Sequence, residues 1–69
     1  MRIRIEFHVR EIRQERGLTI RQLADLSGVS KSNISALEKG EIMPTVHTVC
    51  YLAVALGVEL GDLINYKVS

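Results

Sequence analysis

Two short helical patterns joined by a tight corner constrain this chain more than any other feature. Residues 20–27 and 31–39 each space their apolar side chains as one face of a helix does, and Ser27-Gly28-Val29 joins them. So short a junction forces the two helices to cross at a steep angle, and a glycine at the corner takes a positive φ without steric cost. Ala24 precedes the corner by one turn, and its small side chain lets residues 31–39 pass close over the preceding helix.

Three further helices are predicted around this pair. Their expected spans, which end at glycines or at the start of the tail, are residues 8–17, 46–56 and 59–64. Thr19 and Gln22 have the spacing of a capping box at the start of the helix over residues 20–27. Five short helices in 69 residues predict an all-α bundle, folded as a single domain over residues 1–69, with the helix pair at residues 19–39.

The two ends of the chain have the pattern of short strands. Ile3, Ile5 and Phe7 alternate with charged side chains, and the only other candidate strand is residues 64–68. A two-stranded pairing of the termini is therefore expected, either within one chain or between two chains.

Composition excludes several classes of protein. The chain is 46% hydrophobic with a net charge of +1, which is too apolar for a disordered tail. Its single cysteine, Cys50, cannot form an intrachain disulfide and is interpreted as a small core residue of a protein from a reducing cytoplasm. No signal peptide is visible, and the uncharged run over residues 42–58 is too short and too polar for a membrane span.

Catalysis and cofactor binding are not predicted. The sequence has no nucleophile–base pair, no phosphate-binding loop and too few residues for a pocket of useful size. His8 and His47 lie far apart without a third ligand nearby, so no metal site is expected. We therefore expect neither an enzyme nor a cofactor.

The helix over residues 30–39 has a polar face that the core does not need. With Ile34 and Leu37 directed inward, a rotation of 100° per residue leaves a polar set directed outward or flanking the N-terminal end: Lys31, Ser32, Asn33, Ser35, Ala36 and Lys39. A helix that enters the major groove of DNA needs such a face, with hydrogen-bond donors and little bulk. The alternative interpretation is an ordinary solvated helix face.

The motif as a whole resembles a known family. The chain is similar to the lambda-repressor/Cro-like (Xre) helix-turn-helix family over about residues 8–64. The matching residues are Val9-x-x-Ile12-Arg13-x-x-Arg16-Gly17-Leu18-Thr19, Gln22-Leu23-Ala24-x-x-Ser27-Gly28-Val29-Ser30-x-Ser32-x-Ile34-Ser35-x-Leu37-Glu38-x-Gly40, Pro44-Thr45, Ala53-x-Ala55-Leu56-Gly57-Val58 and Leu60-x-Asp62-Leu63. The resemblance implies a regulator of transcription, more often a repressor, that binds a two-fold operator in double-stranded DNA as a homodimer. It also implies a bacterial, archaeal or phage-encoded protein that is cytoplasmic and associated with the nucleoid.

The resemblance also assigns roles to residues. Lys31, Ser32 and Ala36 match positions that read bases, and Asn33 and Ser35 lie beside them. The matched or expected phosphate contacts are Thr19, Arg13, Lys39 and Arg10, and Arg13 with Glu38 matches a structural ion pair. The sequence departs from the family in lacking several polar or positive residues, at Ile20, at Glu41-Ile42-Met43, and at Tyr51 and Val54. We expect weaker non-specific DNA affinity from these changes unless Arg2, Arg4 and Arg10 compensate.

The helix over residues 46–56 is apolar nearly all round, which is typical of burial on more than one side. We expect a homodimer interface made by Tyr51, Val54, Val58, Ile64 and Tyr66, or by the terminal strands. In the alternative, the termini cover this helix within one chain. A second function class remains open: a protein-interaction module or an antitoxin that shares the fold and has weakened or shared DNA binding.

Overall fold

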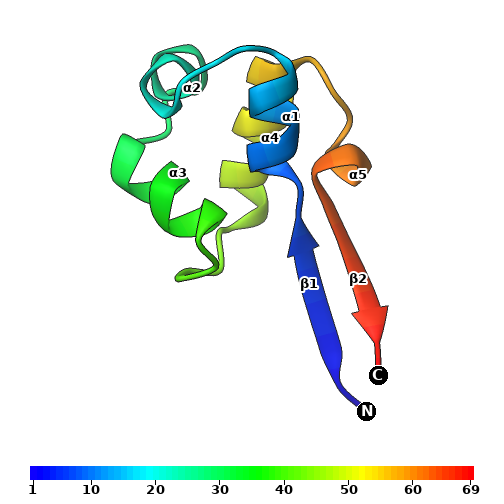
Figure 1. Ribbon diagram of the computed structural model, residues 1–69. Helices are drawn as coiled ribbons and strands as arrows, with labels where there is room; N and C mark the ends of the chain where they lie inside the picture. The colour runs from blue at the N-terminus through cyan, green and yellow to red at the C-terminus, as the bar shows by residue number, and fades with distance from the viewer.

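Five short helices pack around one apolar core, and a ribbon made by the two termini projects from it (Figure 1). The computed structural model describes all residues from 1 to 69. The elements in chain order are β1 (Ile3–Phe7), α1 (Val9–Glu15), α2 (Ile20–Ser27), α3 (Lys31–Glu38), α4 (Val46–Leu56), α5 (Leu60–Leu63) and β2 (Ile64–Val68). The predicted five-helix bundle with a short terminal β pairing is confirmed.

Local signals set the helix boundaries. Thr19 Oγ1 accepts a hydrogen bond from the Gln22 backbone N–H at 3.0 Å, and Gln22 Oε1 accepts one from Thr19 N–H at 2.9 Å, which completes the capping box at α2. Ser30 caps α3 in a similar way, through the Asn33 N–H at 3.1 Å. Gly28 ends α2 with φ at +78°, so the corner before α3 depends on a conformation that glycine adopts freely.

The core draws on every helix. Ten apolar side chains are buried, and they are Val9, Leu23, Val29, Ile34, Leu37, Val49, Leu52, Ala53, Leu56 and Leu63. Ile34 and Leu37, the inward pair of α3, are 0% and 2% exposed. Burial of this inner edge helps to fix the angle of α3 to α2 and leaves the opposite face of α3 outside the core.

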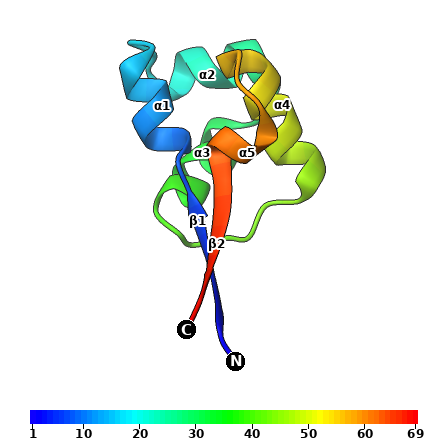
Figure 2. The same cartoon turned by 90° about the vertical axis from the view of Figure 1, so that its right-hand side faces the viewer.

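The strands β1 and β2 pair antiparallel within one chain, with Ile5 opposite Tyr66. Figure 2 shows the two strands crossing as they leave the bundle, the twist expected of an isolated two-stranded ribbon. The ribbon lengthens the molecule to 38 Å against 21 and 20 Å in the other directions. The question of pairing within or between chains is thus answered for these strands: they pair within one chain.

The chain buries only one face of α4. Val49, Leu52, Ala53 and Leu56 point into the core at helical spacing, whereas Val54 is 82% exposed. The prediction that Cys50 is a core residue is wrong, because its side chain is exposed. Position 50 follows buried Val49 by 100° of helical rotation, which carries Cys50 out of the core.

Candidate nucleic-acid interface

The outer side of α3 forms a polar ridge. Lys31, Ser32 and Asn33 are exposed in its first turn, and Lys39 is exposed just past its end. Ser35 and Ala36 are half-buried, since both lie nearer to the neighbouring elements. The residues predicted to read bases are therefore brought together on one surface, with the small side chains of Ser32 and Ala36 along its middle.

A basic hollow of about 160 Å³ lies along one flank of this ridge. It is lined by residues from α1, from the start of α2 and from α3 with its C-cap, namely Arg10, Arg13, Ile20, Ser35, Glu38 and Lys39. Three of the four predicted phosphate contacts thus share one hollow, which carries three positive side chains against one carboxylate. The hollow has the charge to hold an anion beside the ridge.

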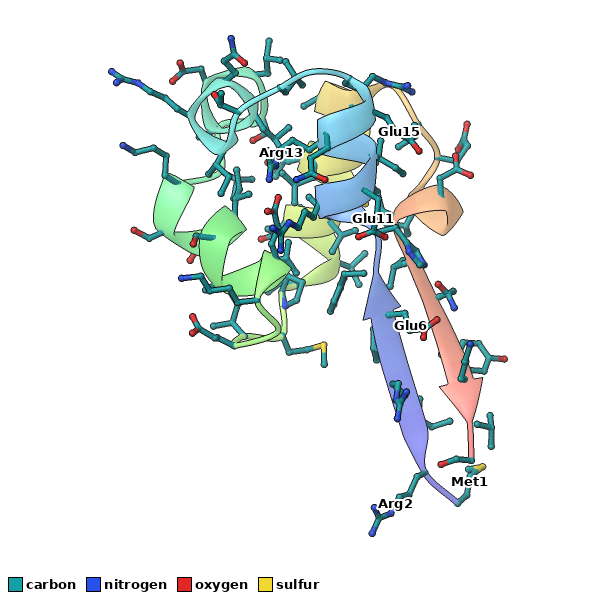
Figure 3. The ribbon with its side chains drawn as sticks, viewed as in Figure 1. Met1, Arg2, Glu6, Glu11, Arg13 and Glu15 are labelled. Carbon is teal, nitrogen blue, oxygen red and sulfur yellow. The ribbon has the colours of Figure 1, made fainter.

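Arg13 and Glu38 fix the floor of this basic hollow. Arg13 Nε and Nη2 donate to the two Glu38 carboxylate oxygens at 2.8 and 3.0 Å, and Nη1 donates to the Leu18 carbonyl oxygen at 2.8 Å. Figure 3 shows Arg13 extending from α1 toward α2 and α3. The hydrogen bonds to Glu38 raise the pKa of Arg13, so the guanidinium stays charged. A guanidinium has five N–H bonds, so two remain for an outside acceptor.

A second hollow, of about 180 Å³, flanks the ridge on the other side. It is lined by Asn33, Leu37, Ile42, Met43, Pro44, Thr45 and Thr48. Thr45 caps α4 by accepting from the Thr48 N–H at 3.2 Å, so the positive end of that helix dipole opens here. Thr45 and Thr48 were not among the residues predicted for the site, although Thr45 directly precedes the helix predicted over residues 46–56, where an N-cap stands.

Thr19 begins α2 at the edge of the same surface. Its side-chain oxygen accepts from Gln22 N–H, so the hydroxyl proton is still free to donate. Thr19 is exposed, and Ile20 next to it lines the basic hollow. The first backbone N–H groups of a helix lack partners within the helix, which makes this end a favourable place for an anion.

The residues predicted for a dimer interface divide into two groups. Val58 and Ile64 are half-buried against the chain's own core. Tyr51, Val54 and Tyr66 are 57%, 82% and 66% exposed. Neither terminus covers the outer face of α4.

The structure has neither a cluster of metal-ligating side chains nor a helix that could cross a membrane. No three His, Cys, Asp or Glu side chains converge as ligands of a metal ion. The longest helix, α4, has 11 residues, and none of the helices combines the length and the hydropathy needed to cross a bilayer.

Known proteins share this fold and sequence. The model of the family described as "Helix-turn-helix" matches residues 9–63. The HTH-type transcriptional regulator SutR of Escherichia coli K12 is 35% identical over 57 residues, which are 83% of this chain and 32% of SutR. The uncharacterized HTH-type transcriptional regulator y4dJ of Sinorhizobium fredii is 43% identical over 54 residues, which are 78% of this chain and 70% of that protein.

A solved structure agrees with these relatives. The crystal structure of the restriction-modification controller protein C.AhdI from Aeromonas hydrophila superposes with a TM-score of 0.77 at 33% identity, covering 80% of this chain and 83% of that one. The chain spans less than half the length of several curated relatives, 32% in the case of SutR. The relatives named above are regulators rather than enzymes, as the sequence predicts. By its sequence match, its five helices and its glycine corner, the chain belongs to the lambda-repressor-like (Xre) helix-turn-helix family.

Proposed function

We propose that this chain is a regulator of transcription that binds specific sites in double-stranded DNA by inserting α3 into the major groove. The observation that carries the proposal is the polar ridge of α3 between two hollows, one of them basic. An α-helix with its side chains is about 10–12 Å across, and the major groove is about 12 Å wide. A ridge of this kind fits the groove, and the two phosphate backbones then follow the flanking hollows.

Each side chain of the ridge suits a specific task. Lys31 offers a charged donor to guanine, and Asn33 offers the paired donor and acceptor that adenine presents. Ser32 and Ser35 donate or accept according to the base edge, and Ala36 fits a thymine methyl group. We assign base contacts to these five residues because all of them lie on α3 outside its buried pair, Ile34 and Leu37.

The phosphate contacts are assigned to the edges of the ridge. Arg10, Arg13 and Lys39 line the basic hollow, and Thr19 offers its hydroxyl and the start of α2. Such contacts position a protein on the duplex and supply salt-dependent affinity without reading sequence. Arg13 does both jobs in this proposal, because its bonds to Glu38 and to the Leu18 carbonyl leave two N–H groups unused.

We further propose that the protein acts as a homodimer on a two-fold operator in the cytoplasm and represses by occupying that site. A homodimer has two α3 ridges, and each ridge reads one half-site of the operator. Binding of both half-sites raises the affinity for DNA and doubles the length of the recognised sequence. The exposed Tyr51, Val54 and Tyr66 supply apolar surface for association.

One observation favours a second function, that of a protein-interaction module or antitoxin. Val46, Cys50 and Val54 form an exposed apolar stripe along α4, away from α3. A partner protein that covers this stripe would leave the DNA-facing surface free or share in its control.

A random-duplex selection at physiological salt tests the proposal. We expect enrichment of a two-fold site with half-sites centred about one helical turn apart, roughly 34 Å. Ser32→Ala or Lys31→Ala lowers affinity for the selected site by about 1–3 kcal/mol and relaxes preference at one base pair. Lys67→Ala on the ribbon removes an equal charge and serves as the matched control, with no change in base preference. Failure to enrich any site, together with a co-purifying protein, favours the interaction module instead.

A further inference from the structure

The register of the terminal ribbon sorts its side chains by polarity. Arg2 N–H donates to Ser69 O at 3.2 Å and Ser69 N–H donates to Arg2 O at 2.9 Å, which extends the pairing of β1 with β2 to the chain ends. Residues directly opposite each other in an antiparallel pair point to the same face. One face therefore carries only uncharged, mainly apolar side chains, in the pairs Ile3–Val68, Ile5–Tyr66 and Phe7–Ile64.

The bundle covers only the base of this apolar face. Phe7 and Ile64 pack against the core where the ribbon leaves the bundle. Farther out, Ile3, Tyr66 and Val68 are 50%, 66% and 58% exposed. A two-stranded sheet is marginal in water by itself, and this one has no connecting turn to hold its ends together. The outer half of the ribbon therefore gains stability from any apolar surface that covers it.

The opposite face is polar and is occupied by the chain's own contacts. Asn65 Nδ2 donates to Glu6 at 2.9 Å, and the His8 ring bridges the Asn65 side-chain oxygen and Glu11 of α1. This face also carries Arg4 and Lys67, which are paired across the strands. In Figure 3 Arg2 lies near the tip, so positive charge accumulates along this side. Two copies of this face would bring together an excess of positive charge, since Arg2, Arg4 and Lys67 outnumber Glu6, so the uncharged face is better suited to meet its own copy.

We infer that the terminal ribbon is a dimerisation arm whose apolar face packs against the same face of a second copy of this chain. The inference names an interface for the homodimer of the proposed function, and it rests on that part of the proposal alone. An uncharged, mainly apolar face offers no opposite charge to a phosphate or to a charged peptide, whereas an identical ribbon offers an apolar face of equal width. Two such faces stack about 10 Å apart with strands aligned within roughly 30° around a two-fold axis.

The available area agrees with a dimer. At their exposed fractions Ile3, Tyr66 and Val68 leave roughly 400 Å² of side chain uncovered, about half of the ~800 Å² that each partner buries in a standard interface. Val46, Tyr51 and Val54 on α4 leave a similar area. Together the two exposed sets approach that standard area, so we include the outer face of α4 in the inferred interface.

Sedimentation equilibrium without DNA tests the inference. We expect the full chain to dimerise in the micromolar range and Tyr66→Ser to weaken dimerisation about a hundredfold, because each substitution enters twice at an interface centre. Lys67→Ser is the matched control: it is adjacent, similarly exposed and on the polar face, and it changes dimerisation less than twofold. Far-UV circular dichroism checks that both variants fold. If Tyr66→Ser does not fold, Ile3→Ser on the same apolar face is used to measure the effect on dimerisation.

The remaining outcomes are decisive in both directions. If Tyr66→Ser and Val54→Ser both weaken the dimer, the ribbon and α4 form one interface and the inference holds. If only Val54→Ser does so, or if the full chain is a monomer at ~200 μM, the inference is wrong. A monomer whose operator affinity falls on Tyr66→Ser assigns the apolar face to DNA and also overturns it. Because no DNA is present in the sedimentation experiment, a failed DNA selection leaves this result unaffected.

Discussion

The guanidinium of Arg13 binds the carboxylate of Glu38 through two hydrogen bonds, from Nε to Oε2 at 2.8 Å and from Nη2 to Oε1 at 3.0 Å. The two residues are 25 positions apart and join α1 to the last residue of α3. Their side chains are 11% and 5% exposed, so water screens the pair only weakly. The same contact therefore holds α3 at its angle and forms the floor of the basic hollow.

Removing one partner of this pair leaves a buried charge without its counter-charge. We expect Glu38→Gln to destabilise the fold by about 3 kcal/mol, with a fall in Tm of more than ~10 °C in a chain of this size. Thermal unfolding followed by circular dichroism measures the change. The exposed Glu41→Gln is the matched control, and a Tm for Glu38→Gln equal to that of this control contradicts the structural role of the pair.

The corner between α2 and α3 depends on backbone conformation rather than on space. Gly28 has φ at +78°, and an added Cβ meets no atom within 4 Å. Gly28→Ala is expected to cost about 1 kcal/mol through the left-handed conformation alone, and Gly28→Asn less than that. Urea unfolding provides the measurement. Gly61→Ala lies in α5, where an added Cβ is equally free and φ is not positive, so it leaves stability unchanged or improves it.

The helices and their corner were predictable because their signals are local. Thr19 with Gln22, Ser30 and Gly57 mark boundaries within three or four residues, and the structure has caps at each of them. The bundle follows from these marks and from the helical spacing of the apolar residues. The outward face of α3 was accessible for the same reason, because Ile34 and Leu37 set the rotation of that helix.

The polar face of the ribbon gives stability a dependence on pH. Hydrogen bonds to Asn65 and then to Glu11 raise the pKa of His8 above 6.5, so its contribution is complete below pH 6.5 and is lost as pH rises through the raised pKa. The hydrogen bond from Asn65 lowers the pKa of Glu6 below 4.5, so that contribution is present above pH 4.5 and is lost as pH falls through the lowered pKa. Both contributions are therefore present between pH 4.5 and 6.5.

Urea midpoints at pH 5.5 and pH 8 test this linkage. The midpoint is expected to fall between the two values in the wild-type chain and to fall less in His8→Gln, which cannot gain the charge. His47→Gln, which removes the other histidine, retains the wild-type difference. An identical pH response in all three proteins means that His8 does not supply the linkage.

Substitutions at Lys39 and Ser32 distinguish contacts to DNA phosphates from contacts to bases. Lys39 lines the basic hollow, so Lys39→Ala is expected to weaken binding to all duplexes alike and to reduce the magnitude of the slope of log K against log salt by about 1. Ser32→Ala leaves that slope unchanged and alters base preference instead. Fluorescence anisotropy at several salt concentrations measures both effects. A Lys39→Ala protein with the wild-type slope contradicts the placement of a phosphate in the basic hollow.

Features built from distant residues were harder to predict. The helix α4 is apolar nearly all round, so its periodicity lacks the contrast that tells the buried face from the exposed one, and Cys50 was placed inside when it lies outside. The link from His8 to Asn65 joins residues 57 positions apart, and no local signal marks it. Alternation predicted two strands but left open whether they pair in one chain, because the same edges serve both arrangements.

Contact between DNA and α3 with its two flanking hollows is the basis of the proposed function. A nuclear magnetic resonance titration measures this contact residue by residue. Backbone amide shifts of the ¹⁵N-labelled chain are followed as the duplex from the selection is added. We expect large changes at residues 31–39 and 19–21 and little change at the ribbon residues 2–6 and 65–69. Changes confined to the ribbon and the outer face of α4, with α3 unperturbed, would contradict the proposed function.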